Sequence, residues 1–394
     1  MNPKVVLAYS GGLDTTVCLQ WLKDRQFDVI AFCVDVGQGE DLQAARRRAL
    51  ACGAVKALIH DLRQEFVRDF VLPALKADAV YEGKYLLATA LSRPLIAKHL
   101  AQVAKQEGAT HVAHGCTGKG NDQVRFEVTL AALAPSITVL APVREWELKS
   151  REEEIAYAQR HRLPITVTKK MLYSLDQNLW GGAIECGPLE DPWTEPPEGA
   201  YQWTRSPQAT PKAPAYVTIG FRRGVPVTLN GRRLPLMTLI QRLNTVGARY
   251  GVGRSDLIED RLVGIKSREV YEAPAATILH TAHRELESLT LHRETLEFKD
   301  LVAARYARLI YDGLWYAPLR TALDGFVDAT QAIVTGEVRM KLWGGQAAPV
   351  GRRSPHTLYR KTLATYGRED AFDQKAAAGF IAIWGLPYKA TGTR

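Results

Sequence analysis

Short apolar runs alternate with longer amphipathic stretches from residue 4 to about residue 168. The runs are "KVVLAYS", "DVIAFCVDV", "AVKALIHDL", "THVAHGC" and "ITVLAPV", all rich in Val, Ile and Ala. Continuous apolar runs of this length are typical of strands buried on both faces of a sheet. The stretches between them have the length and periodicity of helices. This alternation predicts an α/β fold built on a doubly wound parallel sheet.

The pattern changes after residue 170. Proline, glycine and tryptophan are frequent over 170–215, which indicates an irregular connection into a second domain. Polar and apolar residues then alternate over 215–236, with Asn230-Gly231 as an expected hairpin turn. The stretch 236–253 predicts an amphipathic helix that ends at glycine. Mixed helices and strands up to about residue 350 make this second domain α+β.

An amphipathic segment, "DAFDQKAAAGFIAIWGL", lies near the C-terminus at 371–386. It could form a helix that packs on its own domain. It could also form an arm that packs on a neighbouring subunit. The pattern is compatible with both.

Composition narrows the class of protein. A chain of 394 residues exceeds the length that one hydrophobic core usually serves, so we expect two domains. We expect no signal peptide and no membrane span, because no apolar run is long enough. The five cysteines form no C-x-x-C pair, which favours reduced thiols in a cytoplasmic protein over a disulfide framework or a zinc site.

The net charge of +9 is compatible with nucleic acid or with anionic small substrates. The basic residues are dispersed, and the densest clusters are "ARRR" at 45–48 and "GRRS" at 351–354. No basic run is interleaved with aromatic residues. We therefore favour anionic small substrates and expect no nucleic-acid partner.

The first glycine-rich turn, Ser10 to Thr16, follows the first predicted strand and precedes a helix. Glycines allow close backbone approach, and the amides and dipole of a helix N-terminus favour an anion. No lysine follows the glycines, so both the Walker pattern and G-x-G-x-x-G are absent. A loop without that lysine suits a leaving pyrophosphate, which implies attack at the α-phosphate. The alternative is an ordinary turn in which Asp14 and the hydroxyls cap the helix.

The second turn, "HGCTGKGNDQVRFE" at 114–127, is denser in glycine and polar groups. Asn121, Asp122 and Arg125 fall within one helical turn, so they can converge on one ligand. Arginine and aspartate together could bind the carboxylate and ammonium of an amino acid. The alternative is a capping Asp122 that forms an ion pair with Arg125. We favour the binding role.

Five motifs together resemble the argininosuccinate synthase family of the pyrophosphate-loop ATPase superfamily. They are "AYSGGLDTT", "YLLATALSRP", "HGCTGKGNDQVRFE", "SLDQNLWGGAIECGPLEDPW" and "GVGRSDLIEDRLVGIKSREVYEAPAATIL", in that order. The resemblance implies condensation of citrulline with aspartate, with ATP converted to AMP and pyrophosphate through a citrullyl-adenylate. It also implies a nucleotide-binding domain at 1–168, a synthetase domain at 169–358 and a C-terminal oligomerisation arm at 359–394. ATP with Mg²⁺ and a homotetramer follow from the same resemblance.

The resemblance also assigns residues. The implied ATP-binding residues are Ala8, Tyr9, Ser10, Gly11, Gly12, Leu13, Asp14, Thr15, Thr16, Val34 and Gly115. The implied aspartate-binding residues are Thr117, Asn121 and Asp122. The implied citrulline-binding residues are Tyr85, Asn121, Arg125, Ser174, Glu259 and Tyr271. No metal ligand and no acid–base residue is assigned.

Some positions depart from the family pattern. Thr16 keeps a hydroxyl where the family usually has serine, and Val34 replaces a smaller residue. Ala90 and Ala183 stand where members often carry serines that touch citrulline, so each could remove one hydrogen bond. His60, His99 and His280 are expected to be structural. The competing hypotheses are an RNA-modifying adenylating enzyme of the same superfamily and a nucleotide-binding sensor.

Overall fold

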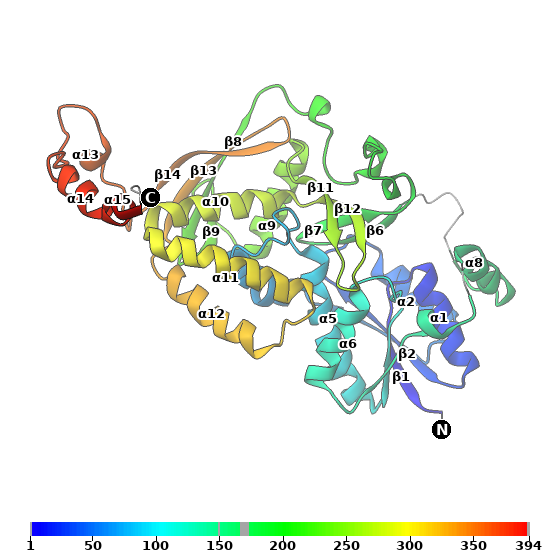
Figure 1. Cartoon of the computed structure of the whole chain (residues 1–394). Coiled ribbons are helices and arrows are strands. Elements are labelled where there is room, and N and C mark those ends of the chain that lie inside the picture. The colour runs from blue at the N-terminus through cyan, green and yellow to red at the C-terminus, as the bar shows by residue number, and fades with distance from the viewer. Residues whose placement is uncertain (1, 149, 166–172, 392–394) are drawn as a thin grey trace.

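The computed structural model describes residues 2–148, 150–165 and 173–391. Its N-terminal part contains a five-stranded sheet of order β3-β2-β1-β4-β5, in which every pairing is parallel. The strands are β1 (Lys4–Ala8), β2 (Asp28–Asp35), β3 (Lys56–Asp61), β4 (His111–Ala113) and β5 (Thr138–Leu140). Each lies within one of the five apolar runs. The predicted doubly wound α/β fold is therefore confirmed (Figure 1).

Helices cover both faces of this sheet. They are α1 (Leu13–Asp24), α2 (Leu42–Ala51), α3 (Arg63–Glu65), η1 (Phe66–Val71), α4 (Leu72–Lys76), α5 (Ala88–Glu107), α6 (Asp122–Leu133), α7 (Pro142–Glu145) and α8 (Arg151–Arg160). Successive side chains of a strand point to opposite faces. Val5 and Leu7 therefore join the core formed with α1, α2 and α8, whereas Val6 joins the core formed with η1, α4 and α5.

The C-terminal part contains two antiparallel sheets, of order β10-β9-β8-β13-β14 and β11-β12-β7-β6. Their strands are β6 (Ser174–Asn178), β7 (Gly181–Glu185), β8 (Ala215–Arg222), β9 (Val225–Leu229), β10 (Arg232–Arg233), β11 (Arg254–Asp260), β12 (Lys266–Glu272), β13 (Gly336–Trp343) and β14 (Gln346–Arg353). The helices are η2 (Gly187–Glu190), η3 (Glu198–Ala200), η4 (Pro207–Ala209), α9 (Leu236–Arg249), α10 (Pro274–Thr290), α11 (Arg293–Tyr311) and α12 (Pro318–Gln331). The α+β expectation is confirmed.

The predicted hairpin turn is present between β9 and β10. Asn230 and Gly231 both have positive φ, at 52° and 74°, as a two-residue type I′ turn requires. The amphipathic helix expected after it is α9. Gly251 follows its end with φ of 73°, as expected for a glycine that ends a helix.

The two parts share one apolar core. Buried side chains form a continuous cluster from Val6 of the parallel sheet, through η1, α4 and α5, to α9, α10, α11 and β13. The predicted domain boundary at 168/169 falls within 166–172, outside the described residues, so it remains a prediction.

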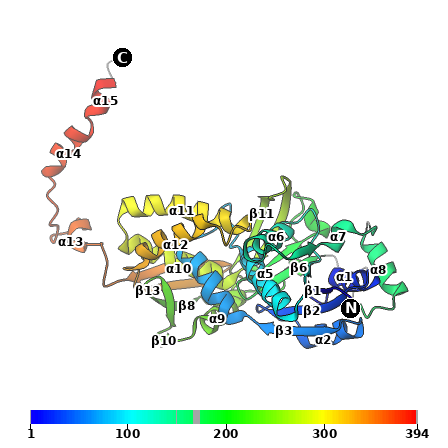
Figure 2. The same cartoon turned by 90° about the horizontal axis from the view of Figure 1, so that it is seen from below.

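The chain leaves the body of the molecule after β14 (Figure 2). Three short helices follow, namely α13 (Lys361–Ala364), α14 (Ala376–Trp384) and α15 (Leu386–Thr391). Phe380 and Trp384 of α14 are 62% and 67% exposed. The segment 371–386 therefore does not pack on its own domain, and the contact with a neighbouring subunit remains a prediction. Within the described ranges, no helix is both long and apolar enough to cross a membrane.

Candidate active site

Both glycine-rich turns lie at the carboxyl ends of neighbouring strands. The first follows β1 and the second follows β4, and these two strands pair directly. The strand order reverses between β1 and β4, which is where ligands bind in doubly wound sheets. A Cβ added at Gly115 would lie 3.2 Å from Cγ2 of Thr15. The two turns therefore form one continuous surface.

The first turn places the N-terminus of α1 in the open. Gly11 has φ of 84°, and Gly12 is the N-cap, with no side chain of the described residues capping it. The hydroxyls of Ser10 and Thr15 lie 3.1 Å apart and hydrogen-bond each other. The Ser10 hydroxyl also accepts from the amide of Gly12 at 3.3 Å, but among the described residues no side chain caps α1 itself. The first amides of the helix are left to bind an anion.

The other residues of the expected ATP site surround this turn. Tyr9 and Thr16 lie below it, with their hydroxyls 3.0 Å apart. The carbonyl of Val34, on β2, accepts a hydrogen bond from Nε2 of Gln38 at 2.6 Å. Ala8 ends β1, and Leu13 begins α1 and is buried.

Arg48 of α2 also contacts the first turn, where its guanidinium donates to the carbonyl of Gly11. Arg48 was not among the residues expected at the site. The only signal was its place in the basic cluster at 45–48. The first turn thus lacks the Walker lysine but has an arginine from a different helix.

The second turn ends in Asn121, the N-cap residue of α6. Its Oδ1 accepts from the amide of Leu262 at 2.9 Å, and its Nδ2 donates to the Tyr311 hydroxyl at 2.8 Å. Both partners come from the C-terminal part of the chain. Thr117, earlier in the same turn, is exposed. Asn121 therefore lies where the two parts of the molecule meet.

Asp122 is held between two arginines. It accepts from Nη1 of Arg125 at 2.9 Å and from Nε of Arg93 at 2.8 Å. Burial raises the pKa of Asp122, but the charges of Arg93 and Arg125 outweigh burial and hold it below its usual range. Asp122 therefore stays ionised. The ion pair with Arg125, the alternative to a binding role, is present in this structure.

Arg93, on α5, connects this pair to a third element. Its Nη2 donates to Oδ2 of Asp176, on β6, at 2.7 Å. Arg93 lies within the motif "YLLATALSRP", but neither it nor Asp176 was among the assigned residues. Together they extend the charged surface from the second turn into the C-terminal part of the chain.

Two stacked tyrosines form the next wall. The rings of Tyr85 and Tyr271 lie 4.3 Å apart and 15° from parallel. The Tyr85 hydroxyl accepts from the amides of Thr89 and Ala90, at 3.1 and 3.2 Å, at the start of α5. The Tyr271 hydroxyl donates to Oε2 of Glu259 at 2.7 Å. Sequence positions far apart thus converge here, as the resemblance implied.

Glu259 is a nearly buried carboxyl, with 4% of the residue exposed. Burial raises the pKa of Glu259, and hydrogen bonds from Tyr271 and Tyr311 partly offset that effect. Such a carboxylate is suited to bind a cation. Water solvates a buried carboxylate poorly, so a positively charged ammonium group would stabilise its negative charge.

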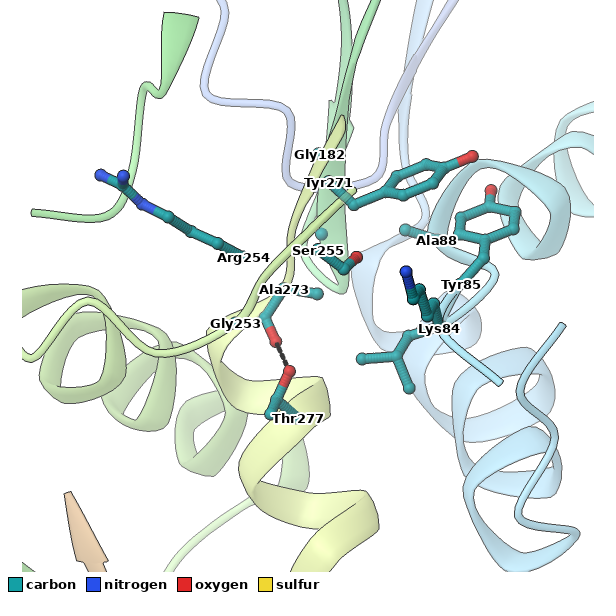
Figure 3. A pocket seen from close by; sticks show the side chains of 12 residues that line it. Lys84, Tyr85, Ala88, Gly182, Gly253, Arg254, Ser255, Tyr271, Ala273 and Thr277 are labelled. Carbon is teal, nitrogen blue, oxygen red and sulfur yellow. Dashed lines mark hydrogen bonds between the residues drawn. The ribbon is translucent and has the colours of Figure 1, made fainter. Parts of the chain in front are cut away.

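A cavity of about 40 Å³ lies beside the stacked tyrosines. In Figure 3 the rings of Tyr85 and Tyr271 lie on one side of it, and Arg254 extends in the other direction. Backbone of Gly182 and Gly253 lines it as well. It is large enough for a few water molecules and too small for a nucleotide.

The remaining positions lie on the β6–β7 hairpin and on α5. Ser174 begins β6 and is exposed. Ala183, on β7, is in register with Tyr271 of β12. Ala90 is fully buried in the first turn of α5. No group of three or more His, Cys, Asp or Glu residues that could hold a metal ion occurs in the described part of the chain.

Comparison with known proteins gives two family matches. The "Arginosuccinate synthase N-terminal HUP domain" matches residues 4–164, and the "Arginosuccinate synthase C-terminal domain" matches residues 173–391. A solved structure described as a predicted subunit of tRNA methyltransferase from Methanocaldococcus jannaschii covers 40% of this chain and 76% of its own, at 15% identity. Its TM-score of 0.30 is too low to carry any weight.

Three curated relatives named argininosuccinate synthase match nearly the whole chain. The protein of Rubrobacter xylanophilus is 57% identical over 99% of this chain and 95% of its own. The protein of Symbiobacterium thermophilum is 58% identical over 98% and 96%, and that of Geobacillus thermodenitrificans is 56% identical over 98% and 95%. With both family models matched in sequence order and such identity over the full length, this chain belongs to the argininosuccinate synthase family.

Proposed function

We propose that this protein joins L-citrulline to L-aspartate at the expense of ATP and releases AMP and pyrophosphate. The ureido oxygen of citrulline attacks the α-phosphorus, and pyrophosphate leaves. The aspartate amine then attacks the ureido carbon of the citrullyl-adenylate, and AMP leaves with the ureido oxygen. The observation that carries this proposal is the contact of the uncapped α1 turn with the second turn, which bears Asn121, Asp122 and Arg125.

The first turn would bind the phosphates that leave. Amides at the N-terminus of α1 and the Ser10 and Thr15 hydroxyls offer donors to pyrophosphate. Ala8 to Thr16, with Val34 and Gly115, would hold ATP. Mg²⁺ would be bound mainly by the phosphate oxygens and would neutralise the charge that develops on pyrophosphate.

Aspartate would bind at the second turn, at Thr117, Asn121 and Asp122. The ionised carboxylate of Asp122 is a partner for an ammonium group, and Arg93 beside it is a partner for a carboxylate. In the absence of aspartate, Asp122 and Arg93 are paired with each other. Binding would therefore exchange one ion pair for two, and every charge in the site would keep a partner of opposite sign.

Citrulline would bind at Tyr85, Asn121, Arg125, Ser174, Glu259 and Tyr271. Glu259 would accept from its ammonium group, and the stacked rings of Tyr85 and Tyr271 would hold its aliphatic part. The two alanines remove candidate hydroxyls. The backbone amide of Ala90 still donates to the Tyr85 hydroxyl, so this position helps to orient Tyr85 without a side-chain hydroxyl.

We also propose a cytoplasmic homotetramer. All five cysteines are free thiols, which suits a reducing compartment. The exposed apolar side chains of α14 suit a contact with another subunit. Small molecules, with no nucleic acid, are the proposed partners, and the RNA-modifying alternative is not favoured.

The test is pyrophosphate release by the purified protein with ATP and Mg²⁺. We expect release that depends on citrulline, and argininosuccinate only after aspartate is added. Ornithine, which lacks the ureido oxygen, is the matched control and should give none. Release stimulated by RNA and not by citrulline would contradict the proposal.

The departures at Ala90 and Ala183 have a test of their own. Ala90→Ser and Ala183→Ser should lower the citrulline KM by up to about tenfold each if a hydrogen bond is restored. The ATP KM serves as the internal control. An unchanged citrulline KM in both variants would mean that these positions do not limit binding.

A further inference from the structure

Tyr311 is a fully buried residue at the end of α11, outside every motif in the sequence. Its hydroxyl donates to Oε1 of Glu259 at 2.8 Å and accepts from Nδ2 of Asn121 at 2.8 Å. Asn121 belongs to the N-terminal part of the chain and Glu259 to the C-terminal part. One hydroxyl therefore joins two expected substrate-binding residues from the two parts.

The direction of these hydrogen bonds is fixed by their surroundings. Oδ1 of Asn121 accepts from the backbone amide of Leu262 at 2.9 Å, so the other end of the side chain must be the NH₂ group. That NH₂ can only donate. The single hydrogen of the Tyr311 hydroxyl is then left for the carboxylate of Glu259.

The backbone and ring of Tyr311 hold a third residue. Nε of Arg125 donates to the Tyr311 carbonyl at 3.0 Å, and the guanidinium carbon lies 5.0 Å from the centre of the Tyr311 ring. A Cβ added at Gly313 would lie 2.8 Å from Cα of Arg125. The end of α11 is therefore pressed against α6 at this point.

The Tyr311 ring is itself fixed from the other side. Tyr81 stacks on it at 3.6 Å, only 7° from parallel, and the Tyr81 hydroxyl donates to the carbonyl of Asp260 at 2.8 Å. Asp260 is the neighbour of Glu259 on β11. The hydroxyl thus has a defined position that does not depend on a ligand.

We propose that Tyr311 is a positioning residue for citrulline, which orients Glu259, Asn121 and Arg125 as one set. The proposal rests on the function proposed above. Tyr311 acts through these three side chains, whose polar groups it holds at fixed separations before substrate arrives. Such preorganisation favours binding, because the side chains need not be ordered when citrulline enters.

Tyr311 also affects the charge of Glu259. The titratable groups that face Glu259 are Arg125 on α6, Arg261 after β11, Glu269 and Tyr271 on β12, and Tyr81 and Tyr85 before α5. The hydrogen bond from Tyr311 favours the ionised carboxylate, which is the form that accepts from an ammonium group. Loss of the hydroxyl would raise the pKa of Glu259. The acidic limb of citrulline kcat/KM would then move to higher pH.

The test is Tyr311→Phe, which keeps the ring, its stack on Tyr81 and the backbone bond to Arg125. We expect the citrulline KM to rise about tenfold or more, with a smaller change in kcat and an unchanged ATP KM. The acidic limb should shift upward. The matched control is Tyr306→Phe, on the same helix. The buried hydroxyl of Tyr306 donates to Asp324 at 2.6 Å, so its loss should change neither the citrulline KM nor the acidic limb.

A second measurement separates positioning from general destabilisation. In a Glu259→Gln background, Tyr311→Phe should raise the citrulline KM by less than it does alone, because the part of its effect that acts through the Glu259 carboxylate is already lost. Equal effects in both backgrounds, or an unshifted acidic limb with a normal KM, would overturn the proposal. If the unmodified protein showed no citrulline-dependent activity, the proposed function itself would fail first.

Discussion

Asp122, Arg93 and Arg125 are already paired with one another before any substrate is bound. An isolated charge in such a place would be costly, whereas a paired set can exchange partners at lower cost. Under the proposed function, such a set would let two zwitterionic amino acids bind in a partly buried interface. It also means that no single member of the set can be removed without affecting its neighbours.

Replacement of Asp122 by Asn tests its role in binding aspartate. We expect the aspartate KM to rise about tenfold or more, because a charge-assisted hydrogen bond is lost. Citrulline-dependent exchange of pyrophosphate into ATP, measured without aspartate, should be reduced less. Asp176→Asn is the control, because Asp176 pairs with the same Arg93. Equal losses in the two variants would assign the effect to Arg93 and not to aspartate binding.

Gly11→Ala tests the shape of the first glycine-rich turn and its proposed role in binding ATP. Gly11 has φ of 84°, and a Cβ there would lie 2.9 Å from Cβ of Ala45. We expect the free energy of unfolding to fall by about 2 kcal/mol or more and the ATP KM to rise. The alanine would have a strained backbone and its Cβ would clash with Ala45. Gly39→Ala shares the strained φ, at 75°, but has open space, so it should cost about 1–2 kcal/mol and leave the ATP KM unchanged. Thermal unfolding and steady-state kinetics distinguish them.

At the scale of elements, the sequence predicted the five strands of the parallel sheet well, because each lies in a continuous apolar run. The hairpin at Asn230-Gly231 was equally readable, since its turn chemistry is local. The segment between β3 and α5 was not predicted. Its backbone has positive φ at Asp78 and Leu87, which no adjacent glycine marks, and at Glu82, which Gly83 follows. Tertiary contacts, not local preference, hold it there.

The same distinction applies to the site. The glycine turns were found because their chemistry lies in consecutive residues. Arg93, Arg48 and Tyr311 were missed because each lies on a helix that reaches the site only after folding. Glu259 and Tyr271 were assigned only through the family resemblance, since nothing in their local sequence indicates a ligand.

Asn178 ties the β6–β7 hairpin to α5. Its Nδ2 donates to the carbonyl of Ala88 at 2.8 Å, and its Oδ1 accepts from the amide of Trp180 at 2.9 Å. Asn178→Ala would leave two buried backbone groups unpaired, so we expect the free energy of unfolding to fall by about 2–4 kcal/mol. Gln20→Ala, on the exposed face of α1, should change it by less than about 0.5 kcal/mol in the same urea titration. A small effect at Asn178 would contradict this role.

At the scale of the whole molecule, the C-terminal arm stands out because its apolar side chains do not pack against the rest of the chain. Phe380, Ile381, Ile383 and Trp384 are each more than half exposed, on a helix of nine residues. A helix that short is marginal in water by itself. Packing against another subunit, as proposed above, would supply the missing stability.

Trp384→Asp tests whether that partner is another copy of the chain. We expect the tetramer to dissociate into smaller species in sedimentation velocity experiments, because the aspartate would be buried without a counter-charge. Leu301→Asp is the control, since Leu301 is 68% exposed on α11 of the body. An unchanged tetramer in the Trp384 variant would exclude α14 from the interface.

The apolar core that runs from Val6 to α11 has a consequence for how such genes diverge. The two family models meet between residues 164 and 173, which suggests two interchangeable modules. The packing argues against independent modules, because side chains of η1, α4 and α5 share one core with those of α10 and α11. Recombination between distant relatives at that junction would bring together halves whose core residues had diverged separately. Inheritance of the chain as a single unit is what the packing favours.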